Sequence, residues 1–85
     1  MILTHDAAAQ RFEATTEHGV AVADYQRDGN AVLFTHTEVP EAAQGQGVGS
    51  ALIGKALAWA KGEGLEIVPL CPFVAAYVKE HPDAA

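Results

Sequence analysis

Alternating apolar and polar residues predict three strands in the first half of the chain. Residues 11–16 (RFEATT) place Phe12, Ala14 and Thr16 on one side, and residues 20–26 (VAVADYQ) and 31–39 (AVLFTHTEV) follow the same two-residue period. The Asp-Gly pair at positions 28 and 29 is typical of a tight hairpin turn, and Pro40 ends the third strand. The first ten residues show no such alternation, so we expect a loose lead-in there.

Beyond the run of glycines at 45–49 the apolar period changes to that of a helix. Leu52, Ala56 and Trp59 fall on one helical face, and Gly62 or Gly64 is suited to end the helix. Residues 65–70 (LEIVPL) are typical of a short buried strand.

Proline residues delimit a second predicted helix. Pro72 takes its first position and Pro82 ends it. Its expected inner stripe consists of Phe73, Val74, Tyr77 and Val78. The predicted fold is therefore α+β in the order β-β-β-α-β-α. Three strands pair antiparallel, a fourth is parallel, and two helices pack on this mixed sheet.

Composition excludes several classes of protein. Eighty-five residues predict one domain over residues 1–85, and the net charge of −6 argues against a nucleic-acid partner. One cysteine excludes an internal disulfide, and scattered histidines predict no metal site. The start MILTHDAAAQ lacks the features of a signal peptide, and no apolar run is long enough for a membrane span. We expect a cytoplasmic protein that is a monomer or a weak dimer.

The glycine run Gln44-Gly45-Gln46-Gly47-Val48-Gly49 precedes the first predicted helix directly. Unpaired N–H groups and the helix dipole favour an anion there, and glycine lets phosphate oxygens approach the backbone. The spacing does not fit the dinucleotide fingerprint. A Walker loop is also excluded, because Ala56 stands where its hydroxyl residue belongs. A loop that only caps the helix is the structural alternative.

This motif, Gln-x-x-Gly-x-Gly, resembles the pyrophosphate loop of the GNAT superfamily of acyl-CoA-dependent N-acetyltransferases. The segments HTEVPEAAQGQGVGSALIGKAL and GLEIVPLCPFVAAYVKEHP resemble a branch of very short GNAT-like domains with a Cys-Pro-Phe/Tyr segment, and the likeness spans about residues 30–82. It implies acetyl-CoA, or coenzyme A (CoA), as the ligand. Loop amides would hold the pyrophosphate, and backbone near Glu38 and Val39 would hold the pantetheine arm. The residues expected to contact CoA are Glu38, Val39, Gln44, Gly45, Gln46, Gly47, Val48, Gly49, Ser50 and Cys71.

Three residues are candidates for the chemistry of acetyl transfer. His36 and Glu38 lie two apart on the third strand, so they share a face and either could take a proton from the amine, although such pairs also form solvated stripes. Cys71 precedes Pro72 at a helix start, which can lower a thiol pKa and make a nucleophile, although free cysteine is also a common small core residue. Many GNAT enzymes place a thiolate-protonating tyrosine where Tyr77 lies, but its apolar stripe favours packing.

The chain departs from a full GNAT domain in its first half, which has no room for the helices that build the acceptor site. We therefore expect an open acceptor side, whose acidity favours a cationic amine. The first hypothesis is an acetyl-CoA-dependent N-acetyltransferase. The alternatives are a non-catalytic or self-acylating CoA-binding module and a small interaction module.

Overall fold

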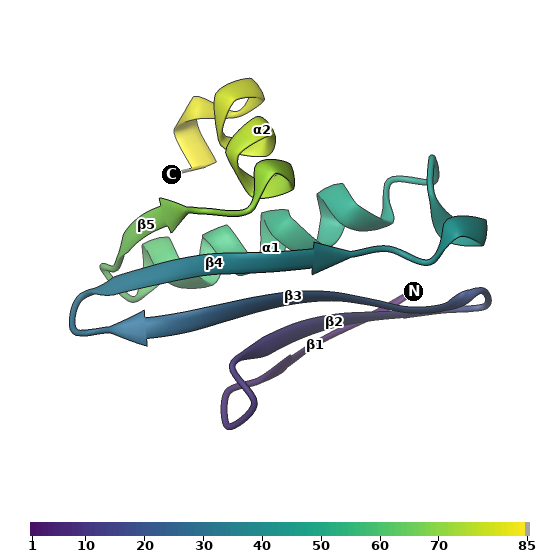
Figure 1. The fold of residues 1–85 in the computed structure, drawn as a ribbon, viewed down its shortest axis with the longest axis horizontal. Helices are drawn as coiled ribbons and strands as arrows, with labels where there is room; N and C mark the ends of the chain where they lie inside the picture. Colours follow the sequence, from purple (N-terminus) through teal and green to yellow (C-terminus); the bar gives the residue numbers. More distant parts are fainter. Residues whose placement is uncertain (85) are drawn as a thin grey trace.

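A computed structural model of the chain describes residues 1–84, in which five strands form one sheet and two α-helices pack against it (Figure 1). The elements are β1 (Ile2–Asp6), β2 (Arg11–Thr16), β3 (Gly19–Asp28), β4 (Ala31–Glu38), η1 (Glu41–Ala43), α1 (Val48–Gly62), β5 (Glu66–Pro69), α2 (Pro72–Glu80) and η2 (Pro82–Ala84), where η marks a 3₁₀ turn. Strand order along the sheet follows the chain. β1 to β4 pair antiparallel and β4 pairs parallel with β5, so the predicted mixed α+β sheet with two packed helices is confirmed.

The N-terminal segment is a strand, so the predicted loose lead-in over the first ten residues is wrong, and the sheet has one strand more than expected. β1 pairs with β2 in a register that sets Leu3 opposite Ala14 and His5 opposite Phe12. The imidazole of His5 stacks on the Phe12 ring at 3.9 Å between centroids. A histidine fills the inward position here, so the strand lacks the apolar alternation that marks the others.

Two-residue turns join β2 to β3 and β3 to β4. Thr16 pairs with Gly19, and Asp28 pairs with Ala31. The second turn therefore consists of residues 29 and 30, one position later than the predicted pair at 28 and 29. Gly29 takes a φ of 59°, which glycine adopts at little cost.

The core lies between the sheet and α1. Side chains from every second residue of β2, β3 and β4 are fully or almost fully buried against it; the largest fully buried ones are Phe12, Phe34, Leu52, Ile53, Leu57, Val32 and Val74. α2 lies beside β5 and contacts α1, at the upper edge of the view in Figure 1. Neither α-helix within residues 1–84 is long and apolar enough to cross a bilayer.

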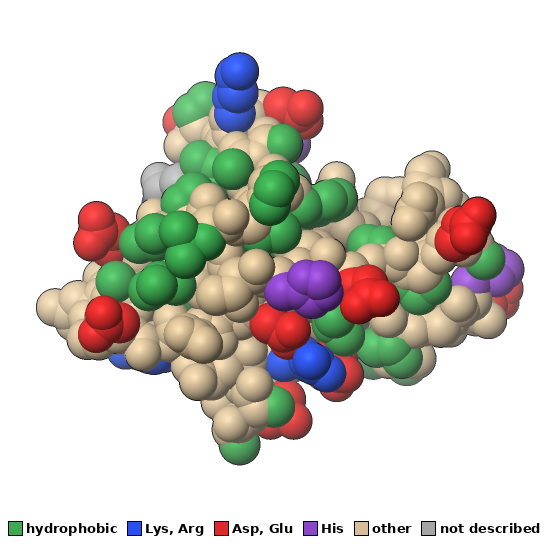
Figure 2. Space-filling model, in the orientation of Figure 1, with side chains coloured by type: hydrophobic (Ala, Val, Ile, Leu, Met, Phe, Trp, Pro, Cys, Tyr) green, Lys and Arg blue, Asp and Glu red, His purple; other side chains and the backbone are tan. Residues whose placement is uncertain are grey.

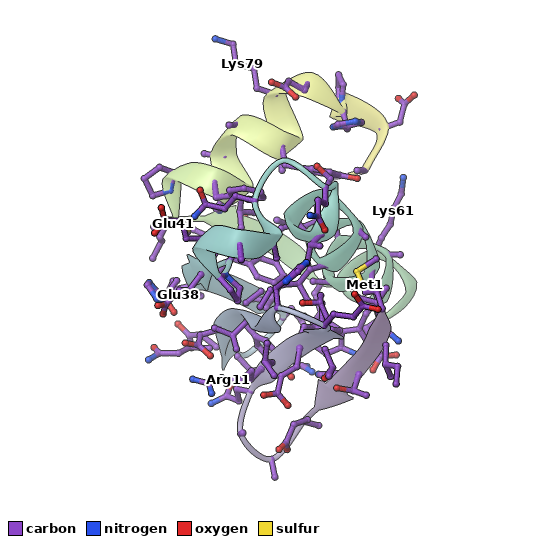
Figure 3. The ribbon with its side chains drawn as sticks, turned by 90° about the vertical axis from the view of Figure 1, so that its right-hand side faces the viewer. Met1, Arg11, Glu38, Glu41, Lys61 and Lys79 are labelled. Carbon is purple, nitrogen blue, oxygen red and sulfur yellow. The ribbon has the colours of Figure 1, made fainter. Side chains whose placement is uncertain are left out.

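The opposite face of β2 and β3 stays open to solvent. The register places Arg11 opposite Asp24 and Asp24 opposite His36 on this face, which we call the open face. Figure 2 looks onto it and shows acidic, basic and histidine side chains gathered near its middle. In Figure 3 the labelled Arg11 and Glu38 lie on the side of the sheet away from α1.

Glycines in the left-handed conformation mark both ends of α1. Gly47, with φ 78°, precedes the first turn, and Gly64, with φ 71°, follows the last. After Gly64 the N–H of Leu65 donates to the carbonyl of Ala60 at 2.9 Å, which is the Schellman arrangement. The predicted end of this helix at Gly62 or Gly64 is confirmed.

Candidate functional site

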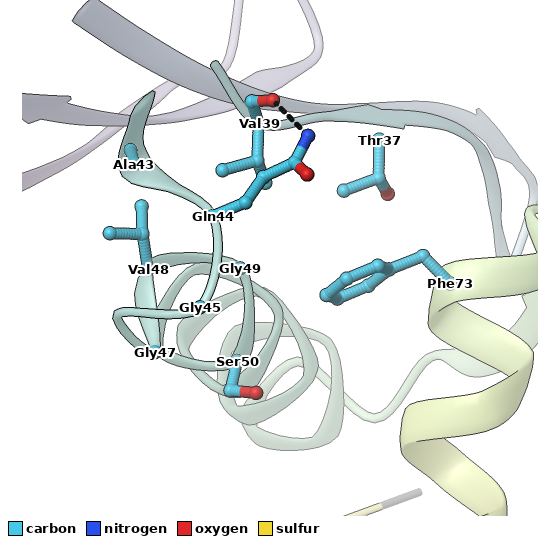
Figure 4. Close-up of a pocket in the computed structure, with 10 residues that line it drawn as sticks. All are labelled: Thr37, Val39, Ala43, Gln44, Gly45, Gly47, Val48, Gly49, Ser50 and Phe73. Carbon is cyan, nitrogen blue, oxygen red and sulfur yellow. Dashed lines mark hydrogen bonds between the residues drawn. The ribbon is translucent and has the colours of Figure 1, made fainter. Parts of the chain in front are cut away.

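A cavity of about 620 Å³ lies where β4 ends, bounded by the loop that follows it, the first turn of α1 and the first turn of α2 (Figure 4). Its lining residues are Thr37, Val39, Ala43, Gln44, Gly45, Gly47, Val48, Gly49, Ser50 and Phe73. The chain thus forms a cavity at the glycine run that the sequence analysis singled out.

Backbone N–H groups of residues 45–50 form a cradle without acceptors from residues 1–84. The first helical hydrogen bond of α1 runs from the Ala51 N–H to the Gly47 carbonyl at 3.0 Å, and no earlier amide of the loop from residue 45 on is bonded. Gly45 and Gly47 have φ values of 80° and 78°, and a Cβ built on either would point into open space. Six free amides beside the positive end of a helix dipole can bind an anion without a basic side chain.

Position 49 favours glycine for a different structural reason from positions 45 and 47. A Cβ at this position would lie 2.5 Å from the tip of the Phe73 ring, far inside carbon contact distance. Phe73 is 42% exposed, so its expected place in the inner stripe of the second helix is wrong; its ring is instead a wall of the cavity. Position 73 lies on the first turn of α2, which turns toward the cavity rather than toward the sheet (Figure 4).

β4 and β5 separate beside the cavity. Their pairing ends at Phe34 and Pro69, after which the Cys71 N–H closes the pair by donating to the Phe34 carbonyl at 2.9 Å. Beyond this point the edge of β4 that faces β5 has no strand partner. A ligand with amide groups could add to this free edge as a short strand does. The Val39 carbonyl, one of the expected contacts, already accepts a hydrogen bond from Gln44 Nε2 at 3.2 Å (Figure 4).

A β-bulge in β4 decides which side chains face the cavity. Asp24 pairs with His36 and Tyr25 pairs with Phe34, so Thr35 is an extra residue and the alternation shifts by one. Thr37 therefore faces the cavity, while His36 and Glu38 point to the open face.

His36 and Glu38 lie together on the open face, as their spacing of two residues along the strand predicts. His36 Nε2 and Glu38 Oε2 are 3.3 Å apart, and the side chains are 58% and 73% exposed. Neither lines the cavity. Their expected role as a general base stays a prediction, and it requires the amine to approach from the open face.

Cys71 lies behind the cavity wall. It is buried, and its Sγ donates to Thr37 Oγ1 at 3.4 Å. Burial raises the pKa of the thiol, but hydrogen bonds from the Thr37 hydroxyl and from the first turn of α2 outweigh it, so the pKa lies below its ordinary value. Cys71 thus contacts the cavity lining through Thr37.

Tyr77 lies outside the cavity, in a smaller groove between α1 and α2 that it lines with Glu80. Its hydroxyl lies 3.0 Å from where a Cβ on Gly54 would be, and its ring stacks on His81 at 4.2 Å. This half-buried position against α1 matches the expected packing role more closely than that of an acid at the cavity.

The structure brings most of the predicted ligand-binding residues together. Those that line the cavity are Val39, Gln44, Gly45, Gly47, Val48, Gly49 and Ser50, whereas Glu38, Gln46 and Cys71 do not. The prediction missed Thr37, Ala43 and Phe73. The Cys-Pro-Phe segment could have indicated Phe73, because it places a large aromatic side chain at a helix start, but no local signal marks the bulge that turns Thr37 inward.

Comparison with known proteins decides the family. A family model described as GCN5-related N-acetyl-transferase matches residues 11–85. Protein NATD1 of Mus musculus is 33% identical over 81 residues, which cover 92% of this chain and 74% of that protein. Protein NATD1 of Homo sapiens is also 33% identical, with 92% and 72% covered. The chain belongs to the GCN5-related N-acetyltransferase family.

Members of this family generally use acetyl-CoA, and the residues of the cavity fit that group. A pyrophosphate needs several hydrogen-bond donors, and five of the six residues with unbonded amides, all but Gln46, line the cavity. Gly45 and Gly47 have no Cβ that could obstruct a ligand there. An extended pantetheine arm needs a free strand edge, which β4 offers beyond Phe34. The chain runs from β1 to β2 through a short turn, and no helix lies between these strands. That the acceptor side is open stays a prediction.

Proposed function

We propose that the chain is an acetyl-CoA-dependent N-acetyltransferase that transfers an acetyl group to an amine. The observation that carries the proposal is the cradle of unbonded amides at the start of α1, which opens onto the cavity beside the separated ends of β4 and β5. Family membership supports the same function. The bound thioester would supply the activated acetyl group; the chain supplies binding, orientation and proton transfer.

Each part of the site has a role in this proposal. The amides of residues 45–50 bind the pyrophosphate, and the free edge of β4 aligns the arm. His36 or Glu38 takes the proton from the amine on the open face, directly or through water. Thr37, on the cavity side of the same strand segment, donates toward a sulfur or an oxygen at the end of the arm.

The acceptor in this proposal is a cationic amine. The rows of paired residues on the open face carry four carboxylates, Asp6, Glu13, Asp24 and Glu38. Against them stand His36 and one arginine, Arg11, whose Nε donates to Asp24 at 2.6 Å. This excess of negative charge raises the local concentration of ammonium groups and slows anionic competitors. The contacts of β2 and β3 with α1 lie on the core face, so within residues 1–84 a protein side chain or a polyamine can reach the open face without meeting a helix.

Replacing Gly47 by alanine tests the amide cradle, and Gly64→Ala is its matched control. Both glycines are left-handed, both have open space around the new Cβ, and they flank the same helix. Each substitution should cost about 1–2 kcal/mol of stability through backbone strain. Only Gly47→Ala should lower affinity for acetyl-CoA, which we expect to fall at least tenfold by calorimetry. Equal affinity in both variants contradicts the cradle.

A second candidate function, self-acylation, is favoured by the contact of Cys71 with Thr37, which lines the cavity, and by the lowering of the thiol pKa that this contact contributes to. In that reaction the acetyl carbon forms a bond to the Cys71 sulfur, and the bond to the CoA sulfur breaks to release the free thiol. Intact-protein mass spectrometry after incubation with acetyl-CoA separates the two functions. A lasting acetyl adduct lost in Cys71→Ser, without acetylation of any offered amine, favours self-acylation. Acetylated amine with an active Cys71→Ser variant supports the first proposal.

A further inference from the structure

A side chain of the glycine loop already occupies a backbone carbonyl just beyond β4. Gln44 Nε2 donates to the Val39 carbonyl at 3.2 Å, and both residues line the cavity (Figure 4). Val39 directly follows β4, on the stretch of chain past the last pair of β4 and β5. In Figure 4 the Gln44 side chain spans the gap between the loop and this end of the strand.

The turn that leads to Gln44 is closed without this side-chain contact. Its own backbone supplies two hydrogen bonds, from the Ala43 N–H to the Pro40 carbonyl at 2.9 Å and from the Gln44 N–H to the Glu41 carbonyl at 3.2 Å. The Gln44 side chain is exposed, so its bond to Val39 is made beside water. A neutral hydrogen bond of this kind shifts an equilibrium only about twofold to tenfold. The side chain can therefore leave the carbonyl while the turn persists.

The Val39 carbonyl is also suited to a ligand in the cavity. The pantetheine arm carries two amide groups, and an amide N–H is the donor that a strand carbonyl receives when an extended ligand adds to it. Gln44 Nε2 is an amide donor too, so it makes the kind of contact that the arm would make. An arm that follows the end of β4 meets the Gln44 side chain in its path, because that side chain lines the same cavity.

Resting on the proposed function, we propose that Gln44 is a placeholder for the pantetheine arm. Binding of the arm displaces Nε2 from the Val39 carbonyl, and an amide N–H of the arm takes over the contact. In the free chain the placeholder covers a carbonyl that another extended chain could bind. It also lowers the affinity for the arm about twofold to tenfold, since only molecules in which the contact is open can bind it.

Calorimetry of Gln44→Met with two ligands tests the proposal. Methionine keeps the length of the side chain and removes the amide donor. The ligands are CoA and its nucleotide part alone, adenosine 3′-phosphate 5′-diphosphate, which lacks the arm. Gln44→Met should bind CoA about twofold to tenfold more tightly than the unchanged chain does, and its affinity for the nucleotide part should not rise.

Gln46→Met is the matched comparison within the same loop. Gln46 Nε2 also donates to a backbone carbonyl, that of Ala42 at 3.5 Å, but Gln46 does not line the cavity. Any loosening of the loop by this substitution should change the affinities for CoA and for its nucleotide part by the same factor. The ratio of the two affinities should therefore move in Gln44→Met and stay in Gln46→Met.

The side-chain amide of Gln44 gives a direct second measurement. In ¹⁵N-labelled protein its NMR signal is the one that disappears in Gln44→Met. Addition of CoA should move this signal to the position of a solvent-exposed glutamine amide, because Nε2 loses the Val39 carbonyl. A signal that keeps its position in the complex would refute displacement.

The calorimetric results can overturn the proposal in three ways. Unchanged or weaker binding of CoA by Gln44→Met refutes the placeholder while leaving the proposed function intact. A shift of the ratio in Gln46→Met as large as in Gln44→Met assigns the effect to the loop as a whole and also refutes it. Failure of the unchanged chain to bind either ligand overturns the proposed function, and the placeholder with it.

Discussion

Replacing Gly49 by alanine tests the contact that forms one wall of the cavity. The new Cβ would lie 2.5 Å from Cζ of Phe73 and 3.2 Å from Cε2. Carbon atoms pack at about 3.5–4.0 Å, so the ring must retreat by roughly 1 Å. Because the ring is 42% exposed, it can turn toward solvent at a cost of about 0.5–1.5 kcal/mol. Alanine in place of glycine within a helix returns up to about 1 kcal/mol, so the net change in the free energy of unfolding should be near zero.

The two opposing contributions can be separated by a double-mutant cycle. In a Phe73→Ala background the clash is gone, so Gly49→Ala should stabilise the chain by up to about 1 kcal/mol. The coupling between the two positions should therefore be about 0.5–1.5 kcal/mol, measured by urea unfolding of the four variants. Gly62→Ala is the control, because a Cβ there meets nothing within 4 Å and its effect should be equal in both backgrounds. Coupling below about 0.3 kcal/mol would refute the contact between ring and helix.

Two further predictions concern ionisable groups. Thr37→Val removes a hydrogen bond to the Cys71 thiolate while keeping side-chain volume, so the pKa of Cys71 should rise and the pH profile of its alkylation should move to higher pH. An unmoved profile would contradict that hydrogen bond. Burial, and then the charge of Lys55, lower the pKa of His5. The unfolded chain consequently binds more protons than the folded one, and this contribution to stability is lost as pH falls below the ordinary pKa of about 6.5. His5→Gln should show a smaller fall in melting temperature between about pH 7.5 and pH 5, and an equal fall would refute the assignment.

Local signals were enough to predict most of the scaffold. A few neighbouring residues were enough to predict each of three features: the strand at residues 11–16, the start of α2 at a proline and the end of α1 before a glycine. The same holds for the amide cradle, because Gly45 and Gly47 directly precede α1, whose first amides have no acceptor within the helix.

Features set by contacts between distant segments escaped prediction. β1 is stabilised by contacts with residues distant in the sequence. The ring of His5 stacks on Phe12 and lies edge-on to Trp59, with 4.8 Å between the centroids of His5 and Trp59. The bulge at Thr35 reverses the side-chain alternation of β4, and its cause lies in the pairing with β3. For this reason the strand period alone could not assign His36 and Glu38 to the open face.

The pairing of β5 with only the first half of β4 has a consequence for how the chain folds. The antiparallel strands are joined by turns of a few residues and can pair early, whereas β5 can join only after α1 has formed the connection. The cavity at the end of β4 is lined by residues of β4, of α1 and of α2. Because α2 follows β5 in the chain, we expect this cavity to form last. We expect amide hydrogens around it to exchange with solvent sooner than those of the central strands, since the segments assembled latest are also those that open first.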